Sequence, residues 1–377
     1  MGMKIRTLIV DDSVFYRGIL SDLLRKLDSV ELLGNAMNGS MALSKIEQLA
    51  PDLVTLDVEM PGMDGLTVLR EIRGRFPKVQ VVMISSATTA SAKVTIDALE
   101  EGALDFIEKP NEGCQEANER QLYRQLRRII NVVETKLILN RGIPETTVRT
   151  VESVPVAPQI DKAPFAVRLP SGPIEIVAIG ISTGGPGALP AVLENLPGSF
   201  HLPVLIVQHM PAMFVTVLVE SLSRRSKIPV MEAVSNSTLQ GGIVYLAPGG
   251  KQMKIVRAPG KDTPTILLTD DPPENFCRPS VDYLFRSVAK IYGGRTLAVI
   301  MTGMGKDGVA GLKLLKESGA TIYAQDQQSS VVYGMASEAV NAGVIDTILP
   351  LKLIGENIVK RVRQGSETNY TSGIRMN

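Results

Sequence analysis

Residues 174–186 read IEIVAIGISTGGP, and this stretch decides how the second half of the chain folds. Its apolar, β-branched first part predicts a buried strand. The glycine pair and Pro186 predict a sharp turn into a helix over 188–193. Ser182 is therefore expected where the strand ends and the helix begins, among free backbone N–H groups that favour negative charge. Such a serine can be a nucleophile beside an oxyanion site, or only a helix cap beside an anion-binding loop.

Two more apolar strands in this half end in chemically useful side chains. The strand over 203–208 ends at His209, and the strand over 296–301 runs into a glycine-rich loop that carries Asp307. Alternating strands and helices predict a mostly parallel, doubly wound sheet, which gathers such ends on one edge. Together with Ser182 they are the set that a serine hydrolase needs. Each also has a structural interpretation: a cap, a satisfied polar side chain and a turn residue.

Two nucleotide-binding interpretations of the glycines fail on spacing. The glycines after the strand over 174–181 lack the G-x-G-x-x-G pattern, and no acid ends a second strand about 20 residues further on. The loop over 303–308 lacks the lysine-serine ending of a phosphate-binding loop. Both interpretations are rejected.

The first 110 residues predict a second α/β unit with acids at the strand ends. Short apolar strands are expected over 7–10, 30–33, 53–56, 79–84 and 106–107, with helices between them. The residues at or just after their ends are Asp11, Asp12, Asp57, Ser85 and Lys109. Three carboxylates brought together repel one another unless a hard cation such as Mg²⁺ lies among them. Asp57 is then a candidate phosphoryl acceptor, and Lys109 could pair with the incoming phosphoryl group as a positive point charge. The alternative is that these acids are simply solvated at the strand ends.

Composition narrows the class of protein. The chain has 377 residues, of which 44% are apolar and 21% charged, so two soluble globular domains are expected. Lys and Arg number 40 against 39 Asp and Glu, which argues against a nucleic-acid effector. No apolar run is long enough to insert in a membrane, and no signal-peptide pattern opens the chain. With only Cys114 and Cys277, a cytoplasmic location is expected. Of the two histidines, His201 is expected to be structural.

Four stretches of the first unit carry a family resemblance: in order, VDDS over 10–13, LDVEMPGMDG over 56–65, MIS over 83–85 and DFIEKP over 105–110. With them the unit closely resembles the receiver domain of response regulators. The resemblance implies a flavodoxin-like fold and phosphorylation of Asp57 by the chemotaxis histidine kinase CheA. It also implies Mg²⁺ on Asp11 or Asp12, on Asp57 and on the Glu59 backbone carbonyl. Ser85 and Lys109 would sense the phosphoryl group.

Five stretches of the second unit carry another family resemblance: IGISTGGP over 179–186, VQHMP over 207–211, LAPG over 246–249, RPSVD over 278–282 and MTGMGKDG over 301–308. With them the unit closely resembles the CheB-type methylesterase family of bacterial chemotaxis. By that resemblance Ser182 is the nucleophile, His209 the base and Asp307 its orienter, and Met304 lends a backbone N–H to the oxyanion hole. The implied reaction is hydrolysis of glutamate γ-methyl esters on chemoreceptors without a cofactor, with deamidation of receptor glutamines as a second activity.

These observations predict a receiver domain over 1–125, a linker over 126–172, a catalytic domain over 173–365 and a polar tail over 366–377. One chain that holds a switch and an enzyme suggests that the unphosphorylated receiver covers the esterase site and that phosphorylation loosens it. A DNA-binding regulator would need a basic helix-turn-helix, and the sequence offers none. A non-catalytic phospho-switch that binds receptors is the remaining alternative.

Overall fold

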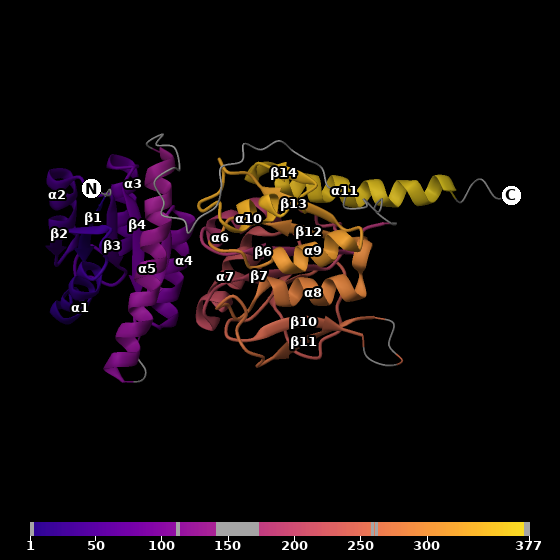
Figure 1. Cartoon of the computed structure of the whole chain (residues 1–377), viewed down its shortest axis with the longest axis horizontal. Helices are drawn as coiled ribbons and strands as arrows, with labels where there is room; N and C mark the ends of the chain where they lie inside the picture. Colours follow the sequence, from indigo (N-terminus) through magenta and orange to yellow (C-terminus); the bar gives the residue numbers. More distant parts are fainter. Residues whose placement is uncertain (1–3, 111–113, 141–172, 258–259, 261–262, 373–377) are drawn as a thin grey trace, which may run out of the picture.

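The computed structural model describes residues 4–110, 114–140, 173–257, 260 and 263–372. Two α/β units lie side by side, and the helices α4 (Thr89–Glu100) and α5 (Gln115–Asn140) stand on the side of the first unit that faces the second (Figure 1). Of the predicted linker over 126–172, residues 141–172 lie outside the described residues. No helix in the described part of the chain has both the length and the apolar character needed to cross a membrane.

The first unit is a five-stranded parallel sheet in the order β2-β1-β3-β4-β5, which confirms the predicted receiver fold. Its helices start where a polar side chain accepts a backbone N–H: Ser13, Asn38, Asp64 and Thr88 each cap one. The strands are β1 (Ile5–Val10), β2 (Val30–Ala36), β3 (Leu53–Asp57), β4 (Gln80–Ser85) and β5 (Asp105–Glu108); the first three helices are α1 (Val14–Arg25), α2 (Gly39–Leu49) and α3 (Gly65–Arg75).

The last helix of this unit extends beyond residue 125, where the receiver domain was predicted to end. Helix α5 continues to Asn140, because Ile129, Val133 and Leu137 lie on a face that is buried in the receiver core. The same apolar cluster takes in Met304 and Val332 of the second unit. The helix therefore belongs to the receiver core and also borders the loop that carries Met304.

The second unit is a seven-stranded parallel sheet in the order β14-β13-β12-β6-β7-β9-β8. Strand β6 is central, with β7 on one side and β12 on the other, so the order of the strands reverses beside it. Such a reversal opens a crevice at the carboxyl ends of the strands. The strands are β6 (Ile176–Ile181), β7 (Val204–Gln208), β8 (Val230–Glu232), β9 (Val244–Leu246), β12 (Thr296–Ile300), β13 (Thr321–Gln325) and β14 (Thr347–Leu349).

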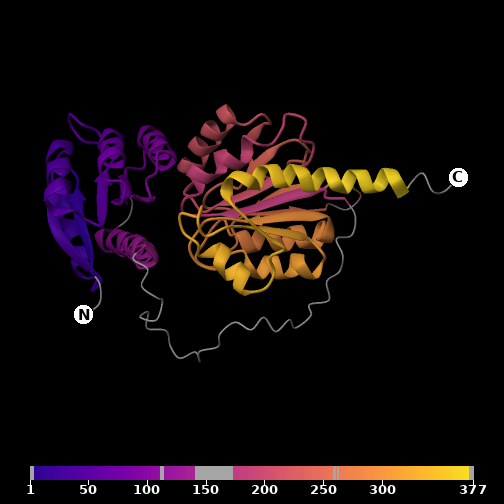
Figure 2. The ribbon, with the colours of Figure 1, turned by 90° about the horizontal axis from the view of Figure 1, so that it is seen from above.

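Helices cover both faces of this sheet. Val177 and Ile179 of β6 join one buried cluster while Ile176 and Ala178 join the other, as a strand buried on both faces requires. The helices are α6 (Gly185–Leu193), α7 (Ala212–Arg225), α8 (Val281–Ile291), α9 (Val309–Glu317), α10 (Met335–Asn341) and α11 (Leu351–Ser372). Helix α11 extends past the rest of the second unit (Figure 2) and includes residues 366–372, where a polar tail was expected. An antiparallel hairpin, β10 (Gln252–Val256) with β11 (Thr265–Thr269), was not predicted.

The two units share a packed boundary. Helix α4 packs against α6 and α7, and its Ala92 and Leu99 belong to the same apolar cluster as Leu189. The rings of Phe106 in β5 and Phe214 in α7 have centroids 4.2 Å apart. The receiver therefore lies directly against the elements that follow β6 and β7.

Candidate functional site

Ser182 and His209 directly follow neighbouring strands. Ile181 of β6 pairs with Gln208 of β7, and the His209 N–H donates to the Ile181 carbonyl at 3.3 Å. On the other side the Ser182 N–H donates to the Thr302 carbonyl, 2.9 Å away, at the start of the loop after β12. Since adjacent strands lie about 4.8 Å apart, all three predicted residues lie along one edge of the sheet.

His209 and Asp307 are in direct contact. The imidazole Nε2 lies 2.8 Å from the Asp307 Oδ2, and both side chains are buried. Sequence analysis predicted this pairing from the strand ends. Because Nε2 is occupied by the carboxylate, Nδ1 is the ring nitrogen left to take a proton from Ser182. The hydrogen bonds of the described residues include none between the Ser182 hydroxyl and the ring.

The Asp307 carboxylate sits at the N-terminus of α8. It accepts the Ser280 hydroxyl at 2.8 Å and the backbone N–H groups of Val281 and Asp282 at 2.7 and 3.1 Å. The Asn275 side-chain amide donates a further bond at 3.1 Å. Burial alone would raise the pKa of Asp307, but its hydrogen bonds with His209 and these donors lower it to about 2. The carboxylate is thus charged whenever the protein is near neutral pH.

The other ring nitrogen of His209, Nδ1, contacts a thiol. Cys277 Sγ lies 3.5 Å from Nδ1, in the loop before α8. Burial would lower the pKa of His209, but the bond with Asp307 and the contact with Cys277 raise it to about 9. In this arrangement the imidazole is protonated at neutral pH, so it must lose a proton before it can act as a base. Sequence analysis gave Cys277 no role, although it directly precedes the quoted RPSVD stretch.

The loop after β12 packs tightly beside Ser182. A Cβ at Gly303 would lie 2.7 Å from the Ser182 Cβ, so only glycine fits this close approach. The Gly303 N–H and carbonyl are both used, with Val332 and Met335. In the part of the chain described here, the neighbouring Met304 N–H has no hydrogen-bond acceptor. It is therefore free to donate, as an oxyanion hole requires.

Gln208 joins the ends of the two central strands, a function that sequence analysis missed. Its buried side-chain Nε2 donates to the Ser182 carbonyl at 3.0 Å and to the His209 carbonyl at 3.2 Å. The signal was available, since Gln208 precedes His209 in the quoted VQHMP stretch. The other histidine, His201, is exposed on the surface beside Phe200 and lies outside the site.

A second polar cluster lies at the carboxyl ends of the receiver strands. Lys109 Nζ is 2.8 Å from Asp57 Oδ2 and 3.0 Å from Asp11 Oδ2, and both carboxylates are buried. Burial raises the pKa of Asp57 to about 6, with the nearby Asp11 adding to the shift and Lys109 opposing it. The structure brings these residues together as the sequence predicted.

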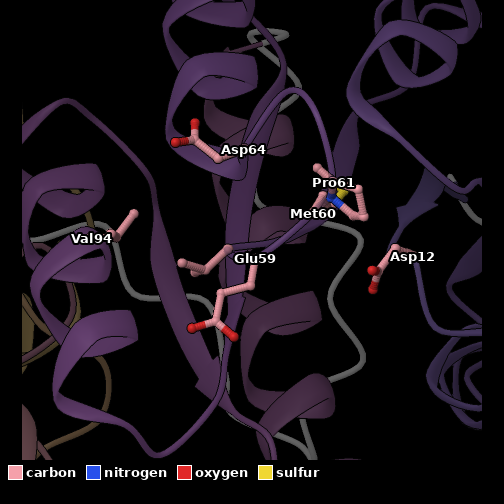
Figure 3. A pocket seen from close by; sticks show the side chains of 7 residues that line it. Asp12, Glu59, Met60, Pro61, Asp64 and Val94 are labelled. Atoms are coloured by element: carbon pink, nitrogen blue, oxygen red, sulfur yellow. The ribbon is translucent and has the colours of Figure 1, made fainter.

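This cluster has the donors that suit a hard divalent cation. Carboxylate oxygens of Asp11, Asp12 and Asp57 lie within 4.8 Å of one another. Three oxygen ligands at this spacing are typical of Mg²⁺ binding. Figure 3 shows the adjoining hollow, in which Asp12 and Glu59 lie on different segments; Val58, Met60, Pro61, Asp64 and Val94 complete its lining. The Glu59 N–H donates to Asp57 at 3.4 Å, and the Glu59 carboxylate accepts the Ser91 hydroxyl.

Ser85 ends β4 next to this cluster. Its buried hydroxyl accepts a bond from Thr95 in α4 at 2.8 Å. Its carbonyl accepts the backbone N–H of Lys109 at 2.7 Å. Ser85 thereby connects α4, which packs on the second unit, to the residue that pairs with Asp57.

Comparison with known proteins gives two family matches. Residues 7–116 match the response regulator receiver domain, and residues 177–358 match CheB methylesterase. A protein-glutamate methylesterase/protein-glutamine glutaminase of Desulfotalea psychrophila is 45% identical over 96% of this chain and 99% of its own length. One from Trichodesmium erythraeum is 43% identical over 95% of this chain and 99% of its own. The crystal structure of the Thermotoga maritima CheB methylesterase catalytic domain is 37% identical, covers 50% of this chain and 98% of that chain, and has a TM-score of 0.48.

Proposed function

Because this chain belongs to the CheB family of receiver-regulated chemotaxis protein-glutamate methylesterases/protein-glutamine glutaminases, we propose that Ser182, His209 and Asp307 are its catalytic residues. The substrates are glutamate γ-methyl esters on chemoreceptors. Specific receptor glutamines are a second class of substrate, since their side-chain amide is the nitrogen counterpart of the ester.

The mechanism is acyl transfer. Neutral His209 takes the Ser182 proton at Nδ1 while Asp307 holds Nε2, and the Ser182 oxygen attacks the ester carbonyl. The Met304 N–H stabilises the developing oxyanion. The imidazolium returns its proton to the leaving methoxide, which departs as methanol. Water then hydrolyses the acyl-enzyme by the same steps, and an amide substrate would release ammonia instead.

The observation that carries the proposal is the bond between His209 and Asp307 on the sheet edge where Ser182 directly follows β6. It is tested by incubating methylated receptor membranes with the full chain and a small phosphodonor. Methanol should appear, and mass spectrometry should find glutamates at the formerly methylated positions. His209→Gln should release none above background. Receptor binding without methanol release would favour the non-catalytic phospho-switch.

Contacts between the units support the proposed gating by the receiver. Asp105 of β5 accepts the hydroxyl of Thr183, the residue after the nucleophile, at 2.7 Å. Glu100 of α4 contacts both Ser221 and Arg225 of α7, at 2.7 and 3.1 Å. A receiver held this way crowds the approach to Ser182. Changes at Asp57 can reach these contacts through Ser85 and α4.

Phe106→Ala should raise the methanol-release rate of the unphosphorylated protein about tenfold. The aromatic pair with Phe214 is worth about 1.5 kcal/mol beyond area burial, and a docked state weakened by that amount opens about tenfold more often. Rates with and without phosphodonor measure the effect, which should shrink once the receiver is phosphorylated. Lys93→Ala is the matched control, because its ion pair with Glu220 is exposed and 3.7 Å long. Equal unphosphorylated rates for all three proteins would contradict gating through this contact.

Asp57 is the proposed phosphorylation site, with the chemotaxis histidine kinase CheA as donor. Asp11 or Asp12, Asp57 and the Glu59 carbonyl would hold Mg²⁺, which supplies charge neutralisation for phosphoryl transfer. Lys109 pairs with the acceptor oxygen, and Ser85 is placed to sense the modified group. We assign the protein to the cytoplasm, where the receptor signalling helices and the kinase meet it.

Mg²⁺ should raise the melting temperature of the receiver transition more at pH 7.5 than at pH 5. With a pKa of about 6, Asp57 is mostly protonated at pH 5 and binds a cation poorly. Because the pKa of Asp57 is raised on folding, its protonated form contributes stability that is fully present below pH 3.8 and is lost as the pH rises through 6. Above that pH, Mg²⁺ relieves the repulsion between the carboxylates. Scanning calorimetry with and without Mg²⁺ measures the shift. Asp57→Asn should show little Mg²⁺ effect at either pH; equal shifts in both proteins would contradict the site.

A further inference from the structure

A half-buried thiol contacts the base of the proposed triad. Cys277 lies in the loop before α8, with Sγ 3.5 Å from the His209 Nδ1 and 3.5 Å from the Asn275 carbonyl. The receiver is docked in this structure, and the thiol still keeps part of its surface in solvent. It therefore combines access with contact to a reacting atom.

The Cys277 thiol contacts the same nitrogen of the His209 ring that must accept the proton of Ser182. Nε2 is fixed by Asp307, so a proton from Ser182 must arrive at Nδ1, the atom that Cys277 faces. Ligand atoms of Cys277, His209 and Asp307 lie within 4.8 Å of one another. A single metal ion does not suit them, because the thiol and the carboxylate lie on different nitrogens of the ring. A modification that enlarges the sulfur would instead press on Nδ1 directly.

The neighbours of the thiol also suit nucleophilic chemistry. Its sulfur contacts one nitrogen of the His209 ring, and Asp307 holds the other. Asp307, held by the α8 N-terminus, favours the protonated ring in the resting protein. The same arrangement of thiol, imidazole and carboxylate that activates catalytic cysteines is thus present beside the serine.

We propose that Cys277 is a modification site at which peroxide or a soft alkylating electrophile switches the esterase off, an inference that rests on the proposed catalytic function. With hydrogen peroxide, the thiolate sulfur attacks one oxygen, the O–O bond breaks and hydroxide leaves. The sulfur becomes a sulfenic acid, oxidised by two electrons, and the peroxide is reduced. The added oxygen lies against Nδ1 and excludes the Ser182 proton. Excess dithiothreitol reverses the change by way of a mixed disulfide, with release of water.

The test uses the full-length Cys114→Ser protein, in which Cys277 is the one remaining thiol. Cys114 is exposed on the receiver and belongs to no site, so this variant keeps its activity. Iodoacetamide is added for increasing times, and intact-mass spectrometry and methanol release are measured on the same samples. Lost activity should equal the fraction alkylated, with the fully alkylated protein at least about 100-fold slower, as loss of a general base requires. Peroxide should give the same loss, restored by dithiothreitol.

Three further proteins separate the explanations. Cys277→Ala and Cys277→Ser are compared with their own untreated rates, and each should keep its starting rate under both reagents. His209→Gln, introduced into the Cys114→Ser protein, should be alkylated about tenfold more slowly, because the thiol loses its cationic partner. Full activity in a completely alkylated protein, or sensitivity that persists in Cys277→Ala, would overturn the inference and leave the esterase intact. Absence of methanol release from untreated protein would instead overturn the proposed function, while the alkylation rates still test the thiol.

Discussion

Ser182→Ala should lower methanol release about 10⁶-fold, the loss typical when a triad loses its nucleophile. The hydroxyl is the atom that would form the acyl-enzyme, and alanine has no group that can take its place. A water activated by His209 would have to attack the ester without that intermediate. Phosphorylation of Asp57 should not restore activity, because opening the receiver exposes a site that lacks its nucleophile.

The fold of this variant should survive. The Ser182 backbone N–H keeps its bond to the Thr302 carbonyl, and the side chain is 3% exposed but small. Because the substitution removes one oxygen atom and keeps the backbone bond, the free energy of unfolding should change by about 0.5 kcal/mol or less. Thermal unfolding measures this. Ser318→Ala, at the opposite end of α9 from Asp307, is the matched control and should release methanol normally. Substantial methanol release by folded Ser182→Ala would remove Ser182 from its role.

The strand ends could be predicted because their signal is local. An apolar, β-branched run that stops at a polar residue identifies both the strand and the residue at its edge, and parallel topology then gathers those edges. Ser182, His209 and Asp57 were all found in this way. The parallel direction of the strands followed from the alternation of strands and helices.

Contacts that depend on loop paths could not be predicted. The loop before α8 turns through Asn275 and Phe276, both at positive φ. The two residue types together do not predict the path that the loop takes. The path delivers Cys277 to the His209 ring and Asn275 to Asp307. The boundary predicted at residue 125 lies inside α5, which continues because Val133 and Leu137 are buried in the receiver core.

Contacts between the units also had no sequence signal. Asp105 lies in a stretch that matches receiver domains, so its acid suggested nothing about Thr183 in the other unit. The sequence also gives no signal for the contact between Phe106 and Phe214, since each ring taken alone fits the core of its own domain. Predicting such pairs requires the docked arrangement, which local patterns do not encode.

Asp307→Asn should lower kcat about 10⁴-fold and leave KM nearly unchanged, as when other triads lose their carboxylate. Asp307 orients the ring and stabilises the imidazolium that forms when Ser182 attacks, and an amide does neither. Ser280 donates to Oδ1 and Val281 to Oδ2, so the amide NH₂ group would face a donor in either position, and the protein should be destabilised by about 2 kcal/mol. Circular dichroism and thermal unfolding show whether the variant remains folded at the assay temperature.

The pH profile distinguishes this role from a structural one. In the parent, kcat/KM should rise with pH to a midpoint near 9, because the base must be neutral and the pKa of His209 is about 9. Asp307, with a pKa of about 2, stays charged across this range. Without the carboxylate the imidazolium loses its main support, so the midpoint should move to lower pH even as the maximum falls. Asp282→Asn is the matched control, since Asp282 lies at the same helix N-terminus and bonds Gly311, not His209. Its midpoint should stay near that of the parent; an unmoved midpoint in Asp307→Asn would mean that the carboxylate does not tune the base.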